Sequence, residues 1–243
     1  MNTNMFPLFI TMRRKINLIV ISCLAIIFLA SCKSETLFQS NFDPTAVNQP
    51  PAAAQTVGTV GIDGPAGAVV VVASPVTTGG KFVKITRNPN ATSVSGLQCN
   101  FTRQAGAGQY NFSATMFIPT GSGLATIQFE QFGQPVSTLT NFLHLDFTQD
   151  NKIRLDDNDA TKFGSFPRDQ VFIVQVTLNI NATTTPTAHI VLAGAGASGV
   201  VDYDILPPFR GMAQQFGAVR LWMGFPWTGS FDATTILVTR RNN

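Results

Sequence analysis

The sequence has 243 residues, of which 44% are hydrophobic and only 12% are charged, and this excludes an intrinsically disordered chain. Its formal charge of +3 includes Arg13, Arg14 and Lys15, which lie in a segment that we expect to be cleaved. Without these three, 13 of the 16 Lys and Arg residues remain against 13 Asp and Glu residues. A neutral mature chain argues against charge-driven binding to nucleic acid or to an acidic membrane surface.

Residues 1–31 have the pattern of a secretion signal. The basic residues 13–15 precede an apolar run at residues 16–29, which is shorter than the roughly 20 apolar residues of a transmembrane helix. Residues 29–32 (LASC) resemble the lipobox of bacterial lipoproteins, in which the cysteine, here Cys32, becomes the lipidated first residue. Met12 is a candidate for the true start. The alternative is an ordinary secreted protein that is cut nearby.

The lipobox resemblance also implies a location in the cell. Acyl chains on Cys32 would anchor the protein, since each buried methylene contributes about 0.8 kcal/mol. In such lipoproteins an aspartate after the cysteine favours retention at the inner membrane. Here that residue is Lys33, so we expect a lipid anchor in the outer membrane, facing the periplasm or the cell surface. Cys99 then remains as the only thiol of the folded domain, and we expect it to be buried and inert.

Residues 32–56 contain the lipidated cysteine and predict a flexible tether, because they include an Asn-Gln-Pro-Pro segment and a short alanine run. Residues 37–43 are an alternative first edge strand. From about residue 57 to 243, polar and apolar residues alternate with a period of two, and turn residues separate the runs. This predicts an all-β domain, an antiparallel two-sheet sandwich or jelly roll with one core. The residues expected to face that core are Leu97, Cys99, Phe101, Tyr110, Phe112, Ala114, Met116, Ile118, Ile127, Phe129, Leu143, Leu145, Phe147, Phe172, Val174, Val176, Leu178, Ile180, Val219, Leu221 and Met223.

The strand layout resembles the concanavalin-A-like lectin and glucanase jelly roll. An opening Phe-x-x-x-Phe-Asp segment at residues 38–43 leads to a long loop and then to residues 79–85 (GGKFVKI). Residues 220–224 (RLWMG) and a final strand at residues 231–238 follow late in the chain. The resemblance implies two packed sheets, one of which meets glycans in many members, but a shared fold does not settle function.

Few residues of the domain suggest catalysis. Glycosidases place two carboxylates about 5 to 5.5 Å apart when they retain configuration, and the folded domain has one glutamate, Glu130, whose candidate partner is Asp146 across neighbouring strands. A polysaccharide lyase needs a base and a cation, for which His144 and Arg220 are candidates with Tyr110 or Tyr203. A non-catalytic domain remains the favoured interpretation.

The sequences of two loops match known ligand-binding motifs. Residues 194–199 (GAGASG) match the dinucleotide fingerprint, but no helix follows, so we interpret them as a flexible loop and expect no nucleotide. Asp156, Asp157 and Asp159 crowd one turn and are candidate calcium ligands, although aspartate is also a common turn residue. We expect no other cofactor.

The only two tryptophans, Trp222 and Trp227, enclose Phe225 and form the best candidate site, because aromatic faces stack on sugar rings. The alternative is that these aromatic residues only cover one end of the sandwich. If the strands near residues 124–131, 142–148, 171–180 and 218–224 share a sheet, their outward residues form one polar surface. Its members would be Gln128, Glu130, His144, Asp146, Gln175, Thr177, Arg220 and Trp222.

The sequence therefore favours an anchored, non-catalytic carbohydrate-binding lipoprotein. Two alternatives stay open: a structural or adhesive lipoprotein that binds another protein, and a polysaccharide lyase or glycoside hydrolase with an atypical site. A polar groove with flat aromatic side chains would favour a glycan, and a large exposed apolar patch would favour a protein partner.

Overall fold

A computed structural model describes residues 34–76, 80–134, 140–224 and 226–241. Cys32, the signal segment 1–31 and Phe225 lie outside these residues. The chain divides into two units, and the sandwich is the second, which spans Glu35–Arg241. Within the described residues, no helix is both long and apolar enough to cross a membrane.

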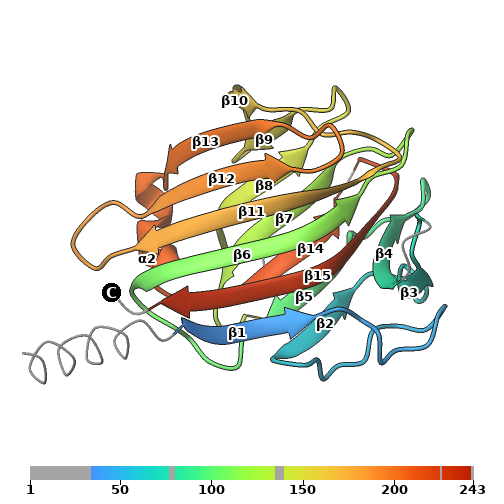
Figure 1. Ribbon diagram of the computed structural model, residues 1–243, viewed down its shortest axis with the longest axis horizontal. Coiled ribbons are helices and arrows are strands. Elements are labelled where there is room, and N and C mark those ends of the chain that lie inside the picture. The colour runs from blue at the N-terminus through green and yellow to red at the C-terminus, as the bar shows by residue number, and fades with distance from the viewer. Residues whose placement is uncertain (1–33, 77–79, 135–139, 225, 242–243) are drawn as a thin grey trace, which may run out of the picture. The chain divides into compact units, whose positions relative to one another are not determined.

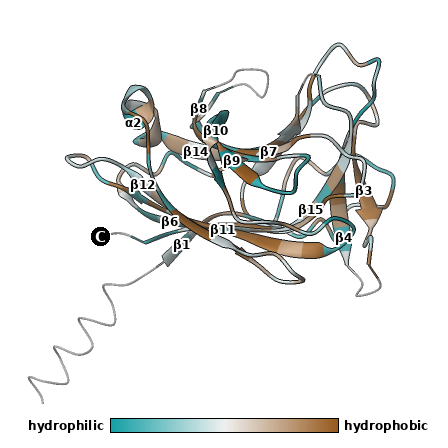
Figure 2. Cartoon of the chain, turned by 90° about the horizontal axis from the view of Figure 1, so that it is seen from above, coloured by the Kyte–Doolittle hydropathy of each residue, from teal (hydrophilic) through white to brown (hydrophobic). Residues whose placement is uncertain are grey.

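The sandwich consists of two antiparallel sheets that lie one over the other (Figures 1 and 2). Sheet A has eight strands among the described residues, and sheet B has seven. The strands of sheet A are, in spatial order, β13 (Gly199–Asp204), β12 (Thr187–Ala193), β11 (Val171–Ile180), β6 (Gly108–Phe117), β15 (Gly229–Arg241), β4 (Lys81–Arg87) and β3 (Val69–Ala73), with β1 (Ser34–Ser40) paired to β15 as well. Sheet B runs through β10 (Asn158–Phe163), β9 (Ile153–Leu155), β8 (Asn141–Phe147), β7 (Ala125–Gln131), β14 (Phe216–Met223), β5 (Ser95–Asn100) and β2 (Thr59–Asp63). The helical elements η1 (Pro207–Phe209) and α2 (Arg210–Ala213) precede β14.

The core lies between the sheets, and every residue expected to face it is buried. Because successive side chains of a strand point to opposite faces, one apolar row per strand fills the interior. Within this core, Phe216 makes edge-to-face contacts with Phe101, Tyr110 and Phe142. Cys99 is buried there, and burial raises the pKa of its thiol, so it is held in the unreactive neutral form. The predicted two-sheet fold is confirmed.

The segment expected as a tether is part of the sandwich instead. Its residues 34–40 form β1, and Leu37, Phe38 and Phe42 are completely buried in the core. Burial of these apolar side chains draws the segment into the sandwich although the residues that follow have the composition of a loop, because each buried phenylalanine or leucine stabilises the fold by about 1.5 to 3 kcal/mol. The alternative of an edge strand in residues 37–43 describes this region better.

Residues 194–199 form the turn between β12 and β13. Gly194 and Gly196 have φ angles of +91° and +83°, which favour glycine, and the chain continues as strand β13. Since no helix N-terminus follows the glycines, the match to the dinucleotide fingerprint carries no binding site.

Candidate functional site

The outward side chains of β14, β7 and β8 form two rows across sheet B. In the first row, Arg220 lies opposite Gln128, and Gln128 lies opposite His144. In the second row, Trp222, Thr126 and Asp146 follow in the same way, and Asp146 lies opposite Arg154 of β9. The polar surface predicted from the sequence therefore exists on these strands.

Two members of that predicted surface lie elsewhere. Gln175 and Thr177 belong to β11, which pairs with β6 and β12 in sheet A. The condition that β11 shares a sheet with β7, β8 and β14 is therefore not met. The alternation of β11 identified its inward face correctly, but alternation contains no information on which strands pair.

A pocket of about 250 Å³ opens over the two rows. It has an aromatic wall, which consists of Trp222, Gly224 and Trp227, and a charged wall, which consists of His144, Asp146, Arg154 and Asp157. Thr126 and Gln128 form its floor. Its full lining comprises Leu124, Thr126, Gln128, Asn141, His144, Asp146, Arg154, Asp157, Trp222, Gly224 and Trp227.

The aromatic wall depends on two close contacts. The Trp222 ring lies against Gly224, where an added Cβ would come within 2.3 Å of ring atom Cζ3. The Arg220 guanidinium stands over the Trp222 ring at 5.7 Å from its centroid. Trp222 lines the pocket and Arg220 does not. The backbone of Trp227 is held in place by buried Arg87, because Nη1 of Arg87 donates to the carbonyl oxygen of Trp227 over 2.7 Å.

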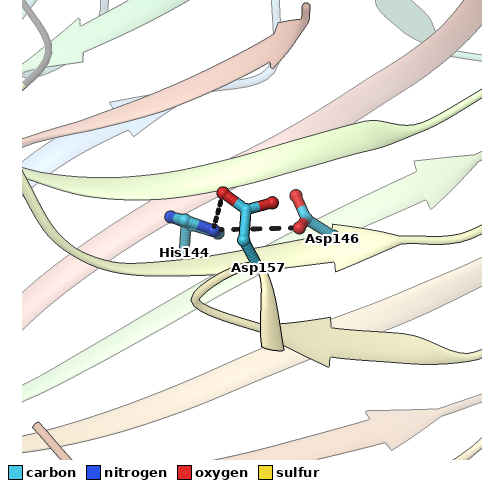
Figure 3. Close-up of side chains that lie close together, drawn as sticks. All are labelled: His144, Asp146 and Asp157. Carbon is cyan, nitrogen blue, oxygen red and sulfur yellow. Dashed lines mark ion pairs between the residues drawn. The ribbon is translucent and has the colours of Figure 1, made fainter. Parts of the chain in front are cut away.

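The charged wall is a compact ion-pair cluster (Figure 3). His144 Nε2 lies 3.3 Å from Asp157 Oδ2 and 3.8 Å from Asp146 Oδ2. Arg154 Nη2 donates to Asp146 Oδ2 and to Asp157 Oδ1, each over 2.8 Å. Asp146 is 2% exposed, and burial raises the pKa of its carboxyl while His144, Thr126 and Arg154 act in the opposite direction.

The pocket floor contains a buried acceptor without a partner. Gln128 is only 3% exposed, and its Oε1 has no hydrogen-bond partner among the described residues. The indole Nε1 of Trp222 is a buried donor in the same state. A buried polar group without a partner costs about 1 to 3 kcal/mol, so both atoms favour a polar occupant of the pocket.

Behind the floor, Glu130 and Arg220 belong to a separate buried network. Glu130 Oε2 accepts a hydrogen bond from Gln98 over 2.7 Å, and Arg220 Nη2 donates to Asp63 Oδ2 over 2.6 Å. Burial raises the pKa of Glu130, while Gln98 and Arg220 partly offset that effect. Neither Glu130 nor Arg220 lines the pocket, so these two expected ligand-binding residues support the site from behind.

The expected carboxylate pair does not form. Asp146 lies opposite Thr126, and Glu130 lies opposite Asn141 four residues further along β7, so the backbone positions of the two acids are offset by about 14 Å at roughly 3.4 Å per residue. Glycosidases need separations of about 5 to 9.5 Å. Glu130 is also completely buried. The cross-strand pairing of Glu130 with Asp146 was therefore wrong.

The tyrosines expected for a lyase lie outside the pocket. Tyr110 is fully buried in the core and donates from its hydroxyl to the carbonyl of Gly106. Tyr203 donates to Asp156 Oδ2 over 2.9 Å, and burial followed by this carboxylate raises its pKa. Neither phenol reaches the pocket lining. His144 is thus the one candidate base among the expected lyase residues that lies at the pocket.

The three aspartates expected to bind calcium do not form a metal-binding group with one another in the described part of the chain. Asp156 Oδ1 accepts the backbone N–H of His144 over 2.9 Å, and its other oxygen accepts from Tyr203. Asp159 lies 3.4 Å from Arg154 and 3.5 Å from Lys162. These contacts hold the turn in place, so Asp156 and Asp159 act as structural partners.

Asp157 instead joins His144 and Asp146 in a possible metal-binding triad. One ligand atom from each residue lies within 4.8 Å of the others. Calcium takes six to eight oxygen ligands, whereas this triad offers two carboxylates and an imidazole, and Arg154 already donates to both carboxylates. The donor set therefore does not fit calcium, because an imidazole with two carboxylates is typical of transition metals and any such ion would have to displace Arg154.

Comparisons with known proteins agree with the fold. Searches with protein-family models and against curated proteins give no match. Among solved structures, a doubly substituted alginate lyase Aly36B in complex with alginate tetrasaccharide aligns with a TM-score of 0.51 at 14% identity, over 86% of this chain and 98% of the lyase. Lectin II from Ulex europaeus aligns with a TM-score of 0.48 at 12% identity, over 87% of this chain and 99% of the lectin. At such identities the likeness establishes the jelly-roll sandwich alone.

Proposed function

We propose that this protein binds a glycan in the sheet B pocket without cleaving it. The observation that carries this proposal is the pairing of an aromatic wall with a charged wall, where Gln128 Oε1 of the floor and Trp222 Nε1 of the aromatic wall have no hydrogen-bond partner among the described residues. A sugar ring offers an apolar face and a rim of hydroxyls that both donate and accept hydrogen bonds. One ring can therefore meet Trp222 with its face and Gln128 and Asp157 with its hydroxyls.

The geometry favours binding over catalysis. Glu130 and Asp146, the carboxylate pair expected for a glycoside hydrolase, do not lie opposite each other, and Glu130 does not line the pocket. A lyase acting on a uronate needs a cation to neutralise the substrate carboxylate, but Arg154 of the pocket already contacts Asp146, Asp157 and Asp159. The lyase alternative rests on His144, which lines the pocket and has no tyrosine beside it.

A protein partner finds less support. The exposed large apolar side chains, Val47, Ile62, Phe132, Ile173, Val200 and Leu206, lie on loops and on both sheets. Protein interfaces typically use a contiguous apolar patch, whereas single exposed apolar residues are normal on soluble domains. The polar pocket is therefore the better candidate site.

Membrane anchoring is a further part of the proposal and rests on the sequence. The lipobox-like residues 29–32 would supply Cys32 as the acylated residue, and Lys33 favours the outer membrane. The glycan-binding domain would then act at the periplasmic face or at the cell surface. Proteinase treatment of intact cells, with detection of the sandwich domain, distinguishes the two faces.

The purified sandwich domain tests the proposal when it is incubated with a panel of soluble polysaccharides. Electrophoretic retardation in polysaccharide gels measures binding, and the release of reducing ends or of unsaturated sugars measures cleavage. We expect retardation by at least one polysaccharide without depolymerisation. Depolymerisation would contradict the non-catalytic part, and the absence of retardation across the panel would contradict glycan binding.

Trp222→Ala assigns the binding to the pocket. Loss of an aromatic stack costs about 1 to 1.5 kcal/mol beyond buried area, so glycan affinity should fall by about tenfold. Phe132→Ala is the matched control, because Phe132 is a half-exposed aromatic residue that packs against Gly217 outside the pocket. We expect Phe132→Ala to lower the melting temperature and leave glycan affinity unchanged. Equal affinity losses in both variants would place the binding site elsewhere.

A further inference from the structure

We infer that the pocket selects glycans that carry protonated amino groups and rejects polyuronates. This inference rests on the proposed function, because it names the chemical class of the glycan that the same pocket would take. The charged wall carries this inference, because His144, Asp146 and Asp157 line the pocket and His144 forms ion pairs with both carboxylates (Figure 3).

Arg154 of the charged wall is already paired with carboxylates and is therefore not available to an anionic ligand. Arg154 lies 2.8 Å from Asp146, 2.8 Å from Asp157 and 3.4 Å from Asp159. Its guanidinium therefore faces three carboxylates at once. A uronate that entered the pocket would compete with all three for the same donors.

The cluster carries an excess of negative charge. Asp146, Asp156, Asp157 and Asp159 surround Arg154 and His144. Within the described ranges, the only other cation in contact with these four carboxylates is Lys162, which contacts Asp159. Two cations against four carboxylates leave two net negative charges when His144 is neutral. Lys162 also contacts Asp150, which adds a fifth carboxylate at the far side of the cluster. A positively charged ligand is therefore attracted, and a polyanion is repelled.

The remaining cation near the site cannot change this balance. Arg220 lies behind the Trp222 ring, is 1% exposed and contacts Asp63 and Glu130. Two carboxylates thus face one guanidinium there as well. Because Arg220 is buried and does not line the pocket, it offers no donor to a ligand there.

The walls together suit an ammonium group. Asp157 stands at the pocket rim with a side chain that is 72% exposed, so a ligand can approach its carboxylate. The indole of Trp222 lies across the pocket, and aromatic rings attract cations as well as sugar faces. An amino sugar can place its ring on the aromatic wall and its ammonium group beside Asp157 and Asp146.

Three oligosaccharides of equal length test the inference. Oligomers of glucosamine and of N-acetylglucosamine differ only in the acetyl group that removes the charge, and an oligouronate supplies the opposite charge. Isothermal titration with the wild-type domain should give the highest affinity for the glucosamine oligomer, lower affinity for its acetylated form and no binding of the oligouronate. Raised salt should weaken the first interaction and leave the second nearly unchanged.

Asp157→Asn locates the charge effect in the pocket. The variant should bind the glucosamine oligomer about three- to fivefold more weakly, as expected for an exposed ion pair, and should lose less affinity for the acetylated oligomer, because asparagine still offers an oxygen to the sugar hydroxyls. Asp202→Asn is the matched control, because Asp202 is 84% exposed and pairs with His189 on sheet A. It should change neither affinity.

The outcomes separate this inference from the proposed function. Equal affinity for the two hexosamine oligomers, or tighter binding of the oligouronate, overturns the amine preference while glycan binding stands. An equal effect of the two aspartate variants overturns the assignment to this pocket. A failure of all three oligomers overturns the amine preference, and retardation in the wider polysaccharide panel then decides on glycan binding.

Discussion

Asp232 of β15 should make the stability of the sandwich depend on pH. Its side chain is 3% exposed, and Oδ1 has no hydrogen-bond partner among the described residues. Burial raises its pKa from 3.8 to about 6, although Lys84, which lies opposite on β4, acts in the other direction. The folded carboxyl thus keeps its proton at pH values at which the unfolded carboxyl has lost it.

The sign and the size of the effect follow from that difference. Between about pH 4 and about pH 6 the folded state binds more protons than the unfolded state, so stability falls as the pH rises and stays lower above about pH 6. A pKa raised from 3.8 to about 6 corresponds to about 3 kcal/mol of lost stability when the carboxyl is ionised. Asp232→Asn removes this charge, but its amide brings a new donor that costs about 1 kcal/mol if unpaired. We therefore expect a gain of about 2 kcal/mol at neutral pH.

Urea denaturation of the wild type and of Asp232→Asn at several pH values between about 4 and 8 measures the effect. The difference in the free energy of unfolding should shrink as the pH falls and should disappear or change sign near pH 4. Asp204→Asn, a substitution of an exposed aspartate on β13, should change stability by less than about 0.5 kcal/mol throughout. A difference between wild type and Asp232→Asn that is independent of pH would refute the reasoning.

Two further predictions concern the core and the anchor. Val176→Asp should lower the free energy of unfolding in urea denaturation by several kcal/mol out of the typical 5 to 15 kcal/mol, because Val176 is 1% exposed in the core. Gln175→Asp, on the exposed face of the same strand, should cost little. Similar costs for the two variants would mean that the inward and outward faces of the strand are assigned one residue out of register. Cys32→Ala should abolish incorporation of labelled palmitate, because the thiol accepts the lipid, and unchanged labelling would argue against a lipoprotein.

The inward faces of the strands could be predicted from the sequence. In β11, Phe172, Val174, Val176 and Leu178 share one face of the strand, and all four are buried. The alternation within a strand is local in sequence, so it predicts which side chains of that strand face the core. Strand pairing depends on residues that are far apart in sequence, such as Val174 and Ala114, and so the sheet to which β11 belongs could not be predicted from alternation.

The candidate site was predicted in part for a similar reason. Trp222, Gln128, His144 and Asp146 were expected on one surface, and they line one pocket. The burial of Glu130 and Arg220 could not be predicted from alternation, because polar residues on the second face of a strand usually meet water. Here Gln98 and Asp63 from neighbouring strands replace that water. Arg154 was overlooked, although its position opposite Asp146 makes it the centre of the charged wall.

The last strand of the chain occupies an interior place in sheet A. Gly229–Arg241 pairs with β6 on one side and with β4 and β1 on the other, and a register shift between Thr234 and Leu237 adjusts the ladder to these neighbours. During synthesis or export in the N-to-C direction, the strands that emerge earlier would therefore wait with open hydrogen-bonding edges until this final segment arrives. Such edges recruit other chains. A nascent sandwich of this topology would depend on a chaperone, or on rapid completion of the C-terminus, to avoid aggregation before it closes.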